Sequence, residues 1–108
     1  MPKTLRTWAG RSSFVYDGSV ANGTEIRYGR NYRWRLRISH EQYKALLRRF
    51  KNHTVDIGTS RTNPPNGSLG EWLQNNVTKT ATASYVGSIL VHEGYAKRMP
   101  KLSKIHIL

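Results

Sequence analysis

The stretch at residues 32–39 reads Tyr32-Arg33-Trp34-Arg35-Leu36-Arg37-Ile38-Ser39. Apolar and basic residues alternate up to Ile38, which is typical of a strand with one buried and one solvent-facing side. Ser39 then stands three residues before Gln42, the spacing of a helix capping box. The helix predicted to follow runs from His40 to Lys51 and places a core stripe at Tyr43, Leu46, Leu47 and Phe50. A strand that leads directly into an amphipathic helix predicts an α+β fold.

Upstream of this stretch, the chain carries the signals of β-structure. Asp17-Gly18 and Asn22-Gly23 are turn dipeptides between apolar residues. We therefore predict an N-terminal β-hairpin over residues 12–38, after a flexible basic arm over residues 1–11. A chain of 108 residues favours one domain, so residues 12–108 are expected to form a single α+β unit.

Downstream of the first helix, the sequence predicts a strand over residues 54–58 and a loop over residues 59–67 that contains Pro64-Pro65. Ser68 stands three residues before Glu71, so a second capped helix is expected over residues 69–76. The loop carries hydroxyls and Arg61, which suits either a plain connection or a site for an anion or a peptide.

A third helix is predicted from about residue 80 to Glu93, with Gly94 as the left-handed residue past its end. A C-terminal β-hairpin follows, with a first strand over residues 95–98. The residues that indicate its returning strand are Leu102, Ile105, Ile107 and Leu108.

From residue 40, the predicted order of helix, strand, helix, helix, strand, strand resembles the winged helix-turn-helix family of DNA-binding domains. In that family the recognition helix ends in Leu, three residues and Gly, and an aromatic or aliphatic residue and basic residues then open the wing. The residues that match this pattern are Leu90, Gly94, Tyr95, Lys97 and Arg98. The resemblance covers residues 40–108 and implies a winged-helix-like core of three helices and a C-terminal β-hairpin.

The resemblance also implies a binding mode. The helix over residues 80–93 would lie in the major groove of duplex DNA, and the wing would grip phosphates. The residues expected to be exposed at and before the helix are Lys79, Thr80, Thr82, Ser84, Tyr85 and Ser88. The wing would contribute Lys97, Arg98 and Lys101.

Net charge is the strongest compositional signal. Lys and Arg number 18 against six Asp and Glu, which gives a charge of +12. A surface this basic attracts polyanions, of which nucleic acid is the commonest. The expected cations are Arg30 and the ladder Arg33, Arg35 and Arg37, spaced about 7 Å apart along one strand face. Lys44 and Arg48 of the first helix and Arg61 of the loop extend this set.

Several function classes find no support in the residues. The chain has no cysteine, its four histidines lack metal-ligand spacing, and its six acids are scattered, so we expect no enzyme activity, no cofactor and no metal. No apolar run is long enough to span a bilayer and no secretory signal is visible, so a cytoplasmic or nucleoid-associated protein is expected.

We therefore expect non-catalytic binding of nucleic acid, with double-stranded DNA as the first choice. The alternation of Tyr28 and Tyr32 with Arg27 and Arg30 also suits single strands or RNA, on which bases stack. Two alternatives stay open: a basic module or inhibitor that docks on an acidic protein, and an RNA-binding subunit.

Overall fold

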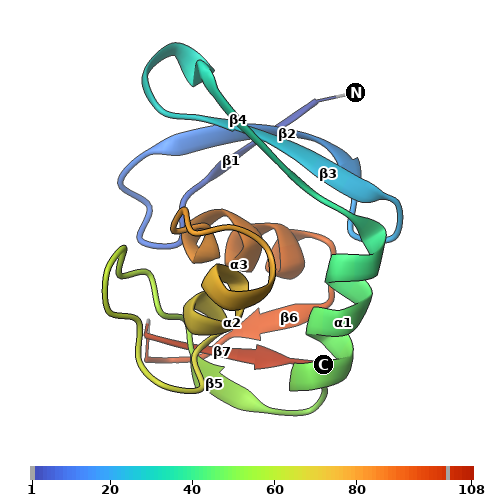
Figure 1. Ribbon diagram of the computed structural model, residues 1–108, viewed down its shortest axis with the longest axis vertical. Helices are drawn as coiled ribbons and strands as arrows, with labels where there is room; N and C mark the ends of the chain where they lie inside the picture. The colour runs from blue at the N-terminus through green and yellow to red at the C-terminus, as the bar shows by residue number, and fades with distance from the viewer. Residues whose placement is uncertain (1, 102) are drawn as a thin grey trace.

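The computed structural model of the protein describes residues 2–101 and 103–108. A four-stranded antiparallel sheet lies at one end of the molecule, a three-stranded antiparallel sheet at the other, and helices between them (Figure 1). This arrangement confirms the predicted α+β class. Met1 of the predicted arm and Leu102 of the predicted returning strand lie outside the described residues.

The larger sheet contains β1 (Lys3–Arg6), β2 (Ser13–Ser19), β3 (Gly23–Tyr28) and β4 (Trp34–Ile38) in sequential order. Residues 3–6 of the expected flexible arm instead form β1, and the expected hairpin is part of this four-stranded sheet. The reason lies in apolar packing. Leu5 of β1 stands opposite Phe14 of β2 and packs against the core, and Trp8 just after β1 is buried.

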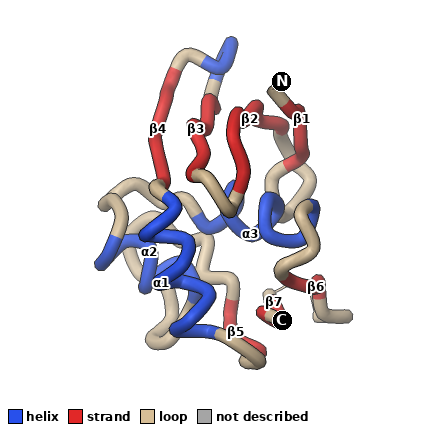
Figure 2. Tube along the Cα trace, turned by 90° about the vertical axis from the view of Figure 1, so that its right-hand side faces the viewer, coloured by secondary structure: helices blue, strands red, loops and turns tan. Residues whose placement is uncertain are grey.

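A 3-10 turn, η1 (Arg30–Tyr32), forms the tip of the β3–β4 hairpin, which projects away from the helices (Figure 2). Asn31 and Tyr32 have φ angles of 58° and 54°, in the left-handed region that a strand does not use. The strand predicted from Tyr32 therefore begins at Trp34. Arg33 caps the turn and is not part of the ladder.

The first two helices follow the sequence closely. Helix α1 (His40–Phe50) has the predicted capping box, with the Ser39 hydroxyl accepting from the Gln42 N–H and the Gln42 side chain accepting from the Ser39 N–H. Its buried residues are Tyr43, Leu46 and Phe50. Helix α2 (Leu69–Asn76) is capped by Ser68 as predicted, although the Glu71 carboxylate accepts from the N–H of Gly67.

Helix α3 (Ala83–His92) is shorter than expected and lies between the two sheets (Figure 1). Six of its residues are buried. Gly87 has no side chain, which allows Trp8 and the Ile57 side chain to approach the helix backbone closely. Gly94 has a φ of 86°, so it ends the helix in the predicted left-handed conformation.

The smaller sheet contains β5 (Thr54–Asp56), β6 (Ala96–Arg98) and β7 (Lys104–Ile107) in the order β5-β7-β6. Its strands β6 and β7 form the predicted C-terminal hairpin. Ile105 and Ile107 of β7 are fully buried beneath the helices. No helix within the described residues is long and apolar enough to cross a membrane.

Candidate nucleic-acid interface

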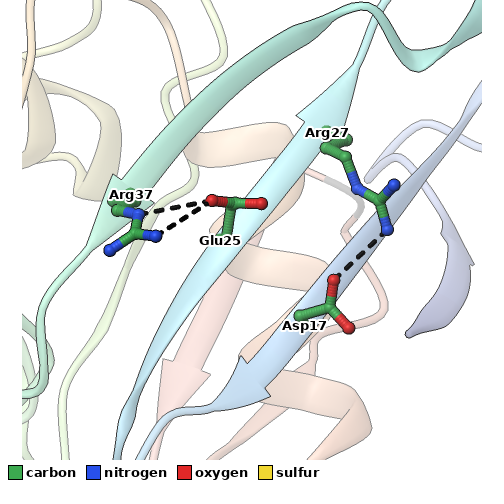
Figure 3. A network of polar contacts seen from close by, with 4 residues as sticks. All are labelled: Asp17, Glu25, Arg27 and Arg37. Carbon is green, nitrogen blue, oxygen red and sulfur yellow. Dashed lines mark hydrogen bonds and ion pairs between the residues drawn. The ribbon is translucent and has the colours of Figure 1, made fainter. Parts of the chain in front are cut away.

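The outer face of the larger sheet carries charges of both signs. Arg27 and Asp17 form an ion pair with a nitrogen–oxygen distance of 3.2 Å, and Arg37 pairs with Glu25 at 3.3 Å (Figure 3). Arg37 of the predicted ladder therefore has a carboxylate partner on the neighbouring strand. Glu25 stands directly opposite Arg37 in the β3–β4 register, whereas Asp17 stands opposite Glu25 and reaches Arg27 diagonally.

The arginine ladder is thereby reduced to one strand position without a carboxylate partner. Arg35 is exposed and stands opposite Arg27, and it forms no ion pair within the described part of the chain. Arg33 is also exposed but lies at the hairpin tip. The three arginines therefore do not form a continuous row of free charge.

The exposed face predicted for the third helix is wrong at two positions. Thr82 is 1% exposed and Ser88 is 7% exposed. The larger sheet and its loops cover this face, as shown by the Trp8 N–H, which donates to the carbonyl of Ser84. The ring of Tyr85 packs against Phe14 and Tyr28, with centroid distances of 5.1 Å and 5.0 Å. The covered helix is not free to enter a major groove.

A cleft of about 390 Å³ opens where the β3–β4 hairpin, the loop after β5 and the start of α3 meet. We call it the aromatic cleft. Its walls carry three aromatic rings, one guanidinium and several hydroxyls, from Tyr28, Trp34, Thr59, Arg61, Ser84 and Tyr85. Thr80, predicted as a contact residue, also lines it. None of the described lining residues is acidic.

Trp34 is the prominent apolar group of this cleft. Its side chain is 58% exposed, and together with Leu108 it is one of the two large apolar residues that the described chain exposes. Sequence periodicity places it on the core face of its strand, with Leu36 and Ile38. Trp34 begins β4 next to the tip of the β3–β4 hairpin, and this hairpin extends past the helices (Figure 2). The sequence correctly predicted on which face of the strand Trp34 lies, but it did not predict an exposed ring at a cleft.

The indole of Trp34 has a defined position. A side chain at Gly29, where φ is 79°, would collide with the indole, so the ring lies directly against the backbone of Gly29. The Arg33 guanidinium lies 5.7 Å from the indole centroid, within the range of a cation–π contact. The sequence signals available for this arrangement were Gly29 just before the turn and Trp34 at the start of the strand.

Tyr85 supplies a neutral polar group to the cleft. Burial raises the pKa of its phenol above the usual value, and Tyr28 raises it further, whereas the positive charge of Arg61 lowers it. The phenol therefore remains protonated at neutral pH and can donate a hydrogen bond. Arg61 and Tyr85 both line the cleft, so a positive charge and a neutral donor face the same space.

The loop that carries Arg61 is held by α2. The Gln74 side-chain amide donates to the carbonyl oxygens of Ser60 and Arg61, at 3.1 Å and 3.2 Å. These bonds fix the backbone at Arg61 and leave its guanidinium exposed. Both sequence interpretations of this loop, a plain connection and a site for an anion or a peptide, are compatible with an arginine at the edge of a cleft.

The remaining predicted cations are spread over the molecule. Arg30 is exposed at the hairpin tip, and Lys79 is exposed beside Thr80 of the cleft lining. Lys44 and Arg48 are exposed on α1, along a different side of the molecule (Figure 1). On the C-terminal hairpin and its turn, Lys97, Arg98 and Lys101 are exposed.

Arg98 is committed to a structural contact. Its Nη1 donates to the Trp8 carbonyl at 2.9 Å, and its guanidinium lies 4.1 Å from the Trp8 ring centroid. This contact joins the C-terminal hairpin to the loop between β1 and β2. Arg98 therefore stabilises the fold whether or not it also contacts a phosphate.

The histidines and acids do not assemble into a metal centre within the residues that the structure describes. No protein-family model, curated protein or solved structure matches the chain. The case for a function therefore rests on the chain's own residues.

Proposed function

We propose that this protein binds nucleic acid without catalysing a reaction, through the end of the larger sheet that carries the aromatic cleft. The observation that carries the proposal is the separation of charge. Arg61 lines a cleft whose described lining contains no carboxylate, and the exposed Arg33 lies 5.7 Å from the indole of Trp34 in that lining. A polyanion can approach this end without meeting a negative charge.

The charge balance of the whole chain supports the same conclusion. Among the described residues, three of the 18 Lys and Arg side chains form ion pairs with a carboxylate: Arg27, Arg37 and Lys104. Arg6 and Arg98 donate to backbone carbonyls instead, and most of the remaining cations are exposed to solvent. Phosphates are the natural ligand because each contact releases a condensed counterion and adds favourable free energy.

The order of elements supports a winged-helix-like core as part of the proposal. From α1, the chain runs through β5, α2, α3, β6 and β7, which is the order of the winged helix-turn-helix resemblance. The β6–β7 hairpin follows α3 directly and exposes Lys97 and Lys101, as a wing would. The proposed contact differs from that resemblance, because α3 is covered and the cleft beside its start takes its place.

A salt titration with a paired charge reversal tests the proposal. The first variant carries Arg33→Glu and Arg61→Glu at the cleft, and the matched variant carries Lys44→Glu and Arg48→Glu on α1. Both remove the same net charge from exposed positions. We expect the cleft variant to lose at least tenfold in affinity and to reduce the salt slope by about 2, since each lost phosphate contact reduces it by roughly one. The α1 variant should lose much less.

The binding assay uses duplex DNA, single-stranded DNA and RNA at two ionic strengths, and needs no knowledge of a target sequence. Equal losses in the two variants would mean that charge acts without regard to position. A wild-type protein that ignores all three polymers at low salt would contradict the proposal. Capture of an acidic protein that survives nuclease treatment would favour the docking alternative instead. The proposed role fits the cytoplasm or the nucleoid, where these polymers occur.

A further inference from the structure

The aromatic cleft has two features that phosphate binding alone does not require. A duplex backbone needs exposed cations, and Arg30, Arg33 and Arg61 supply them. It does not need an indole that is 58% exposed, nor two tyrosine rings beside it. Exposing Trp34 to water is unfavourable, since burying such a ring would remove a large apolar area from solvent.

Neighbouring residues fix the position of the exposed Trp34 indole. The Gly29 backbone supports the indole on one side, and the β3–β4 register fixes Trp34 opposite Tyr28. Tyr28 in turn lies against Tyr85, whose ring contacts buried Phe14. The three rings of the cleft are therefore linked to the core through Phe14 and would lose little conformational freedom on binding.

The polar groups around the rings select what kind of flat partner fits. Arg61 brings a positive charge, and Thr59 and Ser84 bring hydroxyls. The Tyr85 phenol is a neutral donor. A planar, hydrogen-bonding ring linked to a negative charge matches this set, and an unpaired nucleobase with its phosphate is such a group. The cleft volume of about 390 Å³ lies within the range of small-molecule sites.

We infer that the aromatic cleft binds an unpaired nucleobase of a single-stranded nucleic acid, with the base stacked on Trp34 and its phosphate at Arg61. Bases in a duplex are stacked on each other, so their faces are not available to the indole. The protein then prefers single strands, or the unpaired ends of a duplex, to intact double helix. This inference rests on the proposed function and specifies its substrate.

The test compares three oligonucleotides of about ten nucleotides, a length within known single-strand site sizes. One is a single strand, one is the same sequence as a duplex, and one is a single strand with abasic sites. The proteins are wild type, Trp34→Ala, Trp34→Phe and Leu108→Ala. Leu108 is the matched control because it is the other large apolar side chain exposed by the described residues.

We expect Trp34→Ala to weaken single-strand binding about tenfold or more, and to change duplex binding by less than about twofold. Trp34→Phe should retain most of the affinity, and Leu108→Ala all of it. The abasic strand should bind wild type as weakly as the normal strand binds Trp34→Ala. Melting curves should show that Trp34→Ala is folded, because the side chain lies outside the core.

Each contrary result has a distinct meaning. Equal binding of the normal and abasic strands, or equal loss of single-strand and duplex affinity in Trp34→Ala, would overturn the inference. If steep salt dependence and the effect of the Arg33→Glu, Arg61→Glu variant persist in that case, the proposed function still stands. Failure of wild type to bind either polymer, or preferential binding of an acidic peptide to the cleft, would overturn both.

Discussion

At the β2–β3 turn the larger sheet ends in acids that already have partners, whereas at the β3–β4 turn it ends in arginines and an exposed indole. Asp17 and Glu25 are paired with arginines (Figure 3), and near the same turn Glu93 accepts from the Val20 N–H at 2.9 Å. At the other end, Arg30 and Arg33 have no carboxylate partner among the described residues. One sheet therefore has a charge-balanced end and a charge-rich end.

The six acids of this basic chain are distributed unevenly between the two ends of the sheet. The acids near the β2–β3 turn, Asp17, Glu25 and Glu93, are used for contacts within the chain, which offsets part of the positive charge there. The cleft end is fixed by other means, namely backbone packing, aromatic contacts and the bonds from Gln74. Its cations then remain free for a ligand, at some cost in mutual repulsion.

The substitution with the largest expected effect on stability disrupts the backbone packing that supports the cleft end. A Cβ atom at Gly70 would collide with the carbonyl oxygen of Gly58, and the Gly70 N–H donates to the Ile57 carbonyl at 2.9 Å. Gly70→Ala should therefore lower the free energy of unfolding by about 2–3 kcal/mol, as overpacking of a rigid site does. Urea denaturation measures the change.

Gly67→Ala is the control for this substitution. A Cβ at Gly67 meets nothing within 4 Å, although its φ of 80° adds local strain of about 1 kcal/mol. Helix propensity alone predicts that Gly70→Ala raises the free energy of unfolding, since alanine stabilises a helix interior by about 1 kcal/mol relative to glycine. A stabilised Gly70→Ala protein would show that the loop after β5 can move away, and the cleft would then not be rigidly supported.

The second test concerns the charge-balanced end. The Tyr16 hydroxyl donates to Glu93 at 2.6 Å, and the Tyr43 hydroxyl is bonded to the Thr24 hydroxyl. Burial raises the pKa of both phenols well above the usual value of about 10. Tyr16→Phe should cost about 1–2 kcal/mol at neutral pH, because it leaves one carboxylate oxygen of Glu93 without its donor.

The same tyrosines predict a dependence of stability on alkaline pH. Above pH 10 the unfolded chain loses phenolic protons that the native state keeps, so the free energy of unfolding falls as pH rises. The fall should be shallower in Tyr16→Phe than in wild type, because one raised pKa is removed. Denaturation between about pH 9 and 11 measures it. Identical slopes in the two proteins would mean that Tyr16 ionises equally in both states.

Local signals explain which parts of the molecule were predictable. The capping box at Ser39, the Ser68 cap and the glycine that ends α3 act within a few residues, so the helices near them were predicted to within one residue at those ends. β1 was missed because a strand of four residues is stabilised by a partner and a core that lie elsewhere in the chain.

The candidate site was predictable in composition but not in position. Arg30, Arg33 and Arg61 were expected to bind nucleic acid, and they remain in the proposed interface. Thr82 and Ser88 were expected at the surface because helical periodicity shows one buried face, whereas α3 is covered on both sides by two sheets. The cleft joins segments from residues 28 to 85, and a contact between such distant residues leaves no periodic trace.

The smallest effect comes from releasing one paired arginine. Glu25→Gln leaves Arg37, whose side chain is 83% exposed, without its carboxylate. The loss of stability should stay below about 1 kcal/mol, since exposed ion pairs contribute little. Affinity for nucleic acid at low salt should rise about twofold if the outer face adjoins the bound strand. Binding isotherms and urea denaturation of the same protein give both values.

Glu41→Gln is the matched control, because it removes an equal charge from an exposed acid that pairs with His40 at the start of α1. An equal gain in affinity from both variants would attribute the effect to net charge. A gain confined to Glu25→Gln would mean that the bound strand runs from the cleft along β4 towards Arg37. A loss of affinity in Glu25→Gln would show that the Glu25–Arg37 pair holds Arg37 in its binding conformation. The two ends of the sheet would then act together in binding.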